Sequence, residues 1–176
     1  MAAVEDGSEV ESDCPMRGSH QTLEEVAWLY QVGQMPPEDL PMAAAQALAV
    51  GEESPTLCEL AGLSRHADPR DIHDAFEQAL EELGIALPDY PLARRYALHR
   101  LATSVVAGEV VLADLASDEW GETEVETAEE QAFLRLLPSC GCCFEYTPGL
   151  DEAQWDAQLR IAARALVRCP AVGPGI

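Results

Sequence analysis

Three cysteines within four residues, Cys140, Cys142 and Cys143, form the most specific local motif in the chain. Cys140 and Cys143 have the C-x-x-C spacing of zinc sites and of redox-active thiol pairs. A zinc site of this kind needs a second such pair, or histidines three to five residues apart, and the sequence has neither. A redox pair usually opens a helix after a strand, whereas Pro138 and Pro148 on either side predict a loop. We interpret the three thiols as structural, and a small metal-binding or thiol-redox protein is the alternative function.

His73 and Glu77 lie four residues apart on a segment with helical periodicity. This spacing places both side chains on one helix face, where they could bind a metal ion. The sequence shows no further ligands beside them, and the same spacing is frequent on any charged helix. We therefore expect His73 to be solvated or ion-paired.

The most basic part of the chain is a group of four residues within seven positions: Arg94, Arg95, His99 and Arg100. Such a group could bind phosphate or an acidic segment. In a chain with so many acids we expect intramolecular ion pairs instead, each worth about 0–1 kcal/mol when exposed. The row of arginines from Arg160 to Arg168 has the same two interpretations, ranked in the same order.

Residues 117–130 carry the densest negative charge, with seven acids and no base. A general acid and a general base need carboxyl groups in different environments, and a continuous solvated run does not provide them. We expect this segment to form an acidic face that binds a basic protein partner. The contact residues predicted for it are Asp118, Glu119, Glu122, Glu126 and Glu129.

Composition narrows the range of partners. The 176 residues include 32 acids against ten basic residues, all of them arginine, so the net charge is −22. Nucleic acids and anionic membranes attract basic surfaces, and this charge argues against both. No apolar run approaches the roughly 18 residues that span a bilayer, and the acidic start of the chain lacks the features of a secretory signal. We expect a cytoplasmic protein with free thiols.

Capping signals indicate where helices begin. Ser54 and Asp68 each precede a proline, which is favoured in the first helical turn. Thr22 and Glu25 match a capping box. After Asp68, apolar residues recur at helical intervals around Phe76, which we place in the core. Further helices are expected over residues 40–50, from Asp89 to about Ala107, around Phe133, and from near Asp151.

The longest of these segments follows Pro88 and ends at Gly108. One side of it is expected to carry Leu92, Tyr96, His99, Thr103 and Val106, with Ala102 and Val105 beside them. Residues 110–115 have the only β-like composition, but the run is too short and isolated to imply a sheet, and a short helix through Trp120 fits the sequence equally well. These elements predict an all-α fold: a single compact domain of six or seven short helices at residues 21–169. An acidic disordered tail is expected at 1–20 and a flexible tail at 170–176.

Four segments resemble phrases found in small, acidic, all-helical bacterial proteins: SPTLCELAGL, FEQALEELGIALP, LATSVVAGEV and LRIAARALV. The resemblance covers about residues 40–167 and implies an all-helical domain. It brings no activity, so no catalytic residue is carried over from it. The cysteine motif departs from the pattern of that group.

These observations lead to one expectation about function. The sequence contains none of the glycine, serine or histidine motifs of common enzyme classes, so we predict no enzymatic activity and no cofactor. We expect a non-catalytic cytoplasmic interaction protein whose acidic surface binds a basic partner. An immunity-type or accessory role beside a larger protein fits this expectation.

Overall fold

The computed structural model describes residues 21–110, 115, 120–121, 123–138, 149–170 and 172–174. Within these ranges the chain is all-helical, as the sequence predicts, and no strand is present. In chain order the helices are α1 (Leu23–Gln31), the short 3-10 helix η1 (Pro37–Asp39), α2 (Leu40–Ala49), α3 (Pro55–Gly62), α4 (Pro69–Leu83), α5 (Tyr90–Ala107), α6 (Ala128–Leu134) and α7 (Glu152–Val167). None of the described helices is both long and apolar enough to cross a membrane. The tail predicted at residues 1–20 lies outside the described residues.

The predicted capping residues begin these helices. The Ser54 hydroxyl accepts a hydrogen bond from the Leu57 amide at 3.0 Å, and the Asp68 carboxylate accepts one from the Arg70 amide at 2.9 Å. Each bond satisfies an amide that has no partner within its own helix. At the other end of α4, Gly84 adopts a left-handed conformation with φ of 70°, which costs glycine little.

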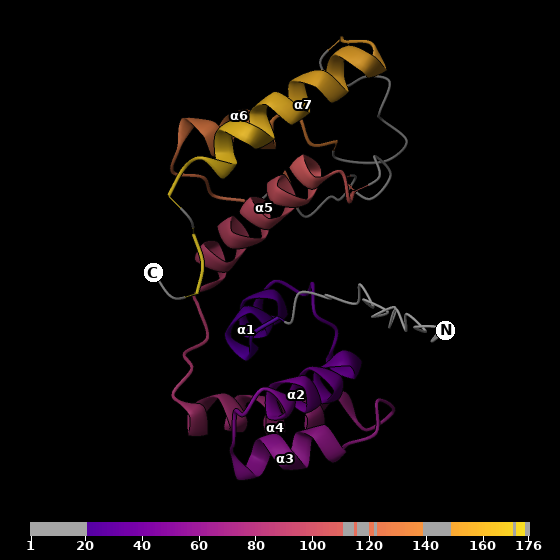
Figure 1. Ribbon diagram of the computed structural model, residues 1–176, viewed down its shortest axis with the longest axis vertical. Coiled ribbons are helices and arrows are strands. Elements are labelled where there is room, and N and C mark those ends of the chain that lie inside the picture. The colour runs from indigo at the N-terminus through magenta and orange to yellow at the C-terminus, as the bar shows by residue number, and fades with distance from the viewer. Residues whose placement is uncertain are drawn as a thin grey trace, which may run out of the picture.

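Helices α2, α3 and α4 enclose one hydrophobic core, in the lower half of the molecule (Figure 1). Leu57, Leu60 and Phe76 have no exposed surface there, and Ile72 is 1% exposed. Phe76 also meets the ring of Tyr30 edge-on, with 5.1 Å between centroids. The burial of Phe76 confirms the core position that its spacing predicts.

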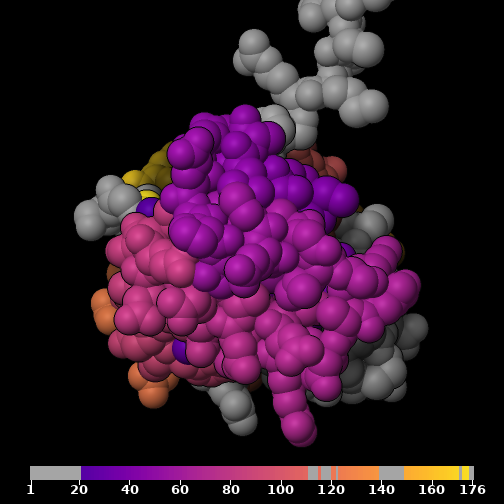
Figure 2. Space-filling model, turned by 90° about the horizontal axis from the view of Figure 1, so that it is seen from below, coloured from indigo at the N-terminus to yellow at the C-terminus, as the bar shows by residue number. Residues whose placement is uncertain are grey.

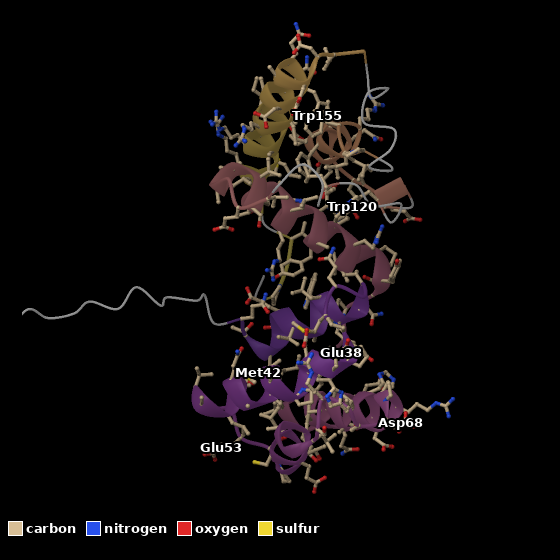
Figure 3. The ribbon with its side chains drawn as sticks, turned by 90° about the vertical axis from the view of Figure 1, so that its right-hand side faces the viewer. Glu38, Met42, Glu53, Asp68, Trp120 and Trp155 are labelled. Atoms are coloured by element: carbon tan, nitrogen blue, oxygen red, sulfur yellow. The ribbon has the colours of Figure 1, made fainter. Side chains whose placement is uncertain are left out.

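Helices α5, α6 and α7 enclose a second core in the upper half, where Figure 3 shows Trp120 and Trp155. Trp155 is 2% exposed, and its indole nitrogen donates to the Leu136 carbonyl at 2.9 Å. Phe133 has no exposed surface. The C-terminal residues also reach this half, where Val172 packs against the second core.

Helix α1 lies between the two halves and contributes to both cores (Figure 1). Leu23, Val26 and Ala27 belong to the first core, whereas Trp28 and Leu29 belong to the second. The capping box predicted at its start is present, with 3.2 Å between the Glu25 amide and the Thr22 hydroxyl. Because α1 serves two cores, the halves share one helix and are not independent of each other.

The predicted side of α5 is confirmed in part, because Tyr96, Ala102 and Val105 are buried. Leu92 and Val106, predicted on the same side, are 37% and 38% exposed, whereas Ala93 and Leu98, which were not predicted there, have no exposed surface. Helix α5 contacts α1, α6 and α7, so it is buried on several sides. A helix covered in this way has no single apolar stripe for a periodicity analysis to find.

Helix α6 ends at Leu134, although the next proline, Pro138, would allow it to continue for three more residues. The amides of Leu136 and Leu137 bond to carbonyls three residues back, at Phe133 and Leu134. This tightened geometry is common where an α-helix ends. Of the predicted β-like run, only residues 110 and 115 are described.

We expect Phe76→Ala to lower the free energy of unfolding by about 3–5 kcal/mol, because it leaves a cavity at the centre of the first core. Chemical denaturation followed by far-UV circular dichroism measures this loss, and the starting spectrum should be predominantly helical. Met42→Ala is the control, since that side chain is 64% exposed and its loss should change stability by about 0.5 kcal/mol or less. A loss below about 1 kcal/mol for Phe76→Ala would contradict the packing described above.

Candidate functional site

A buried carboxylate organises the largest polar cluster among the described residues. Glu130 has no exposed surface. Its Oε1 accepts a hydrogen bond from Nε of Arg95 at 2.9 Å and lies 3.0 Å from Nε2 of His99. Its Oε2 accepts the backbone amides of Glu126 at 2.8 Å and Thr127 at 3.0 Å. We call these five residues the Glu130 cluster.

Local spacing on two helices brings this cluster together. Arg95 and His99 lie one turn apart on α5, so their side chains project from the same side of it. Glu130 is the third residue of α6 and completes a capping box, because its own amide donates to the Thr127 hydroxyl at 3.1 Å. One carboxylate therefore both starts α6 and binds α6 to α5.

The cluster extends to the molecular surface through Arg95. Its Nη1 lies 2.7 Å from Oε2 of Glu126, whose side chain is 72% exposed. Arg95 itself is only 11% exposed, so its guanidinium connects a buried carboxylate with a solvated one. Arg95 and His99 of the basic group on α5 thus contact carboxylates of the same chain, as predicted.

Burial alone would raise the pKa of Glu130, since it disfavours the charged form. The hydrogen bonds from the Glu126 amide, His99, Arg95 and the Thr127 amide outweigh this effect and lower the pKa to about 2. The carboxylate is therefore ionised at neutral pH, and each of its oxygens already accepts two hydrogen bonds. Such a group is a poor proton acceptor for a substrate, and the cluster acts as a structural clamp.

A second basic side chain of α5 is buried beside this clamp. Arg94 is 3% exposed, and its Nη2 donates to the hydroxyl of Thr123 at 3.2 Å. Its guanidinium carbon lies 5.4 Å from the ring centroid of Trp120 and 5.8 Å from that of Tyr90, within cation–π range. Arg94 of α5 therefore contacts Trp120 and Thr123, which precede α6 in the sequence.

The structure describes part of the predicted acidic face. Asp118, Glu119 and Glu122 lie outside the described residues. Glu126 is exposed and Glu129 is half-buried, whereas Glu130 is fully buried and is not part of a solvated run. The segment contains no base of its own, but Arg95 and His99 reach it from α5.

Cys140, Cys142 and Cys143 lie outside the described residues, and their interpretation stays a prediction. Elsewhere in the described chain, no group of three or more His, Cys, Asp or Glu side chains is arranged to hold a metal ion. Cys169 is half-buried, and burial raises the pKa of its thiol, with a further contribution from the carboxylates of Glu129 and Glu130. A thiol held protonated in this way is a weak nucleophile.

His73 links α4 to α1. Its Nδ1 and the Tyr30 hydroxyl share a hydrogen bond of 2.5 Å, and its Nε2 lies 3.4 Å from Oε1 of Glu77. Burial raises the pKa of Tyr30, and the Glu77 carboxylate raises it further, so the phenol stays protonated. His73 is thus half-exposed and in contact with Glu77, as predicted, and Tyr30 is a partner that spacing along α4 does not indicate.

Comparison with known proteins finds no match of this chain to a known protein family, to a curated protein or to a solved structure.

The sequence contained a signal for Glu130 that our sequence analysis did not use. Thr127 and Glu130 have the S/T-x-x-E spacing of a capping box, the same pattern that identifies Thr22 and Glu25. No comparable pattern marks the burial of Arg94: Tyr90 lies four residues before it, but its other partners, Thr123 and Trp120, lie far along the chain. Burial of an arginine follows from the assembled fold alone.

We expect Glu130→Gln to lower the free energy of unfolding at neutral pH by about 3 kcal/mol, because Arg95 and His99 lose their buried charged partner. Folding lowers the pKa of Glu130 from its ordinary value near 4.5 to about 2. The stability that this ionisation contributes is therefore complete above pH 4.5 and lost as the pH falls towards 2. The gap between the wild type and the variant should narrow across this window, as measured by urea denaturation at a series of pH values.

Glu129→Gln is the matched control for this experiment. It makes the same chemical change one residue away, on a half-buried side chain that forms no ion pair with another described residue. We expect a change of about 0.5 kcal/mol or less. A Glu130→Gln effect of the same size, or one that does not depend on pH, would show that the clamp contributes little.

Proposed function

We propose that the protein is a non-catalytic interaction protein whose acidic surface binds a basic protein partner. The observation that carries this proposal is the net charge of −22 on a chain of 176 residues. A negative potential of this size speeds the encounter with positively charged molecules and keeps the protein soluble.

The described arginines strengthen this argument because several are already engaged within the chain. Arg95 pairs with Glu126 and Glu130, and Arg160 pairs with Asp156 at 2.9 Å. Arg94 is buried. These side chains do little to neutralise the remaining surface acids, such as Glu124, which is exposed and forms no ion pair with another described residue.

The Glu130 cluster does not supply a general acid. Its carboxylate is ionised and fully hydrogen-bonded, and its pKa is lowered, whereas a general acid near neutral pH needs a raised pKa. An immunity-type role, in which the acidic protein neutralises a basic toxin, is one form of the proposed function. An accessory role beside a larger cytoplasmic protein is the other.

We expect the partner recovered by affinity purification from the source organism to be basic, and its association rate to fall as ionic strength rises. Replacing Glu122, Glu126 and Glu129 by Gln should lower that rate about tenfold, because charge complementarity acts mainly on encounter. Stopped-flow measurements at low and high salt test both statements. Screening is substantial at physiological ionic strength, where the Debye length is about 8 Å.

The control removes the same charge from scattered positions, by replacing the exposed Glu53, Glu109 and Glu152 with Gln. Both triple variants should keep the helical spectrum and melting temperature of the wild type to within a few degrees (~2–5 °C). Equal rates for the two variants would mean that the acidic face has no local role. An association rate that changes neither with salt nor with these substitutions would contradict the proposed function. The acidic residues would then serve only to keep the protein soluble.

A further inference from the structure

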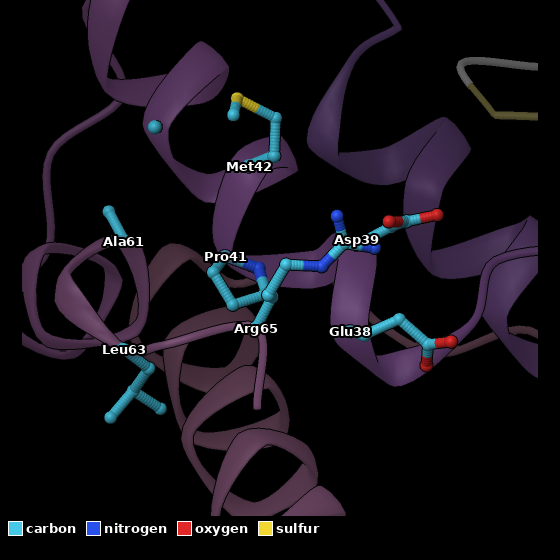
Figure 4. Close-up of a pocket in the computed structure, with 8 residues that line it drawn as sticks. Glu38, Asp39, Pro41, Met42, Ala61, Leu63 and Arg65 are labelled. Carbon is cyan, nitrogen blue, oxygen red and sulfur yellow. The ribbon is translucent and has the colours of Figure 1, made fainter. Parts of the chain in front are cut away.

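A hollow of about 290 Å³ opens between η1, α2 and the end of α3 (Figure 4). We call it the α2–α3 hollow. Its apolar lining consists of Pro41, Met42, Ala45, Ala61 and Leu63. Met42 is 64% exposed, although the apolar side chains of Leu40 and Ala44 on the same helix have no exposed surface.

Three charged residues complete the lining of this hollow. Glu38 and Asp39 lie on η1, and both are exposed. Arg65 follows α3, and in Figure 4 its side chain runs past Pro41 towards Asp39. The hollow therefore combines an apolar surface with two carboxylates and one guanidinium.

The half of the molecule that contains this hollow is the more negative of the two. Residues 21–88 carry thirteen acids against two arginines, whereas residues 89–176 carry fourteen acids against seven. Figure 2 looks onto the first of these halves. The densest acidic segment of the sequence, at residues 117–130, lies in the other half. Long-range attraction for a cation therefore acts on α1–α4 as well as on that segment.

Size and charge decide what could occupy the hollow. At about 290 Å³ the hollow is at the lower end of the range for small-ligand pockets, about 300–1,000 Å³, and it has room for an apolar side chain of a partner. A second copy of the chain would bring its own thirteen acids against these thirteen, and residues 1–20 carry five acids against one arginine. Like charges on the two surfaces would oppose either contact. A basic segment of another protein meets neither obstacle.

We infer that the α2–α3 hollow is a docking site for a basic, amphipathic segment of a protein partner. One apolar side chain of that segment packs against Met42, Ala45 and Leu63, and its cations face Glu38 and Asp39. Flexible methionine side chains suit such a contact because they adapt to the shape of the partner. The inference that the partner is basic rests on the proposed function. The contact itself lies outside the acidic segment at 117–130.

The test uses the full-length protein with isotope-labelled methionine methyl groups. Three synthetic helical peptides are added to it in separate titrations, and NMR records the methyl signals of the protein. The first contains leucine and lysine, the second replaces every leucine by glutamine, and the third replaces every lysine by glutamate. We expect the Met42 signal to shift with the first peptide and to stay nearly unchanged with the other two. Met35 is half-buried, packs against both cores and does not line the α2–α3 hollow, so its signal serves as an internal reference.

Met42→Arg and Val50→Arg form a matched pair for the same titration. Each replaces an exposed apolar residue by the same cation: Met42 lies in the first turn of α2 and is 64% exposed, and Val50 directly follows the helix and is 63% exposed. Met42→Arg should weaken binding of the leucine–lysine peptide about tenfold, as expected for loss of a contact at the centre of an interface. Val50→Arg, which changes the net charge equally, should change it about twofold or less.

Three results would overturn the inference: equal binding of the glutamine–lysine peptide, equal binding of the glutamate peptide, or equal effects of the two arginine variants. Each would show that the hollow does not select a basic segment with an apolar anchor. The proposed function would survive any of them, because it is tested on the native partner through the acidic residues at 122, 126 and 129. Conversely, a native partner that is not basic would contradict the proposed function even if the peptide binds at Met42.

Discussion

Burial of α1 on opposite sides is the constraint on which the rest of the structure depends. Of the described helices, it is the one whose buried residues belong to both hydrophobic cores. Leu23, Val26 and Ala27 close the core of α2–α4, and Trp28 and Leu29 close the core of α5–α7. A helix of nine residues is marginal by itself in water, so α1 forms because two sets of neighbours cover it. The position of each half relative to the other follows from this shared helix.

The two halves are joined within themselves by different means. Around α3 and α4 the contacts are mainly apolar, with Phe76 fully buried at the centre. Between α5 and α6 an ionised carboxylate does the same task, since Glu130 binds Arg95 and His99. Hydrogen bonds to buried charged groups are directional, so they fix the angle at which the short α6 meets α5. Apolar packing thus stabilises the half that contains the α2–α3 hollow, whereas a buried ion pair stabilises the half that contains the acidic segment at 117–130.

Local signals were enough to predict most of the helix starts. Thr22, Ser54 and Asp68 each cap the helix expected of them, because a cap depends only on the next three residues. The interior side of α5 could not be predicted in this way, since it depends on three neighbouring helices. The Glu130 cluster was partly visible, as a capping-box spacing at Thr127, but its partner Arg95 is 35 residues away in sequence. That pairing exists only once α5 and α6 have met.

The order of synthesis gives the double role of α1 a consequence in the cell. Residues 21–88 leave the ribosome before α5 and can form the core of α2–α4 before α5 exists, since domains fold progressively during translation. Until α5 and α7 follow, the side of α1 that bears Trp28 and Leu29 has nothing to cover it. Exposed aromatic surface of this kind attracts chaperones and promotes aggregation. The strong negative charge on the nascent half, thirteen acids against two arginines, keeps such chains apart during that interval.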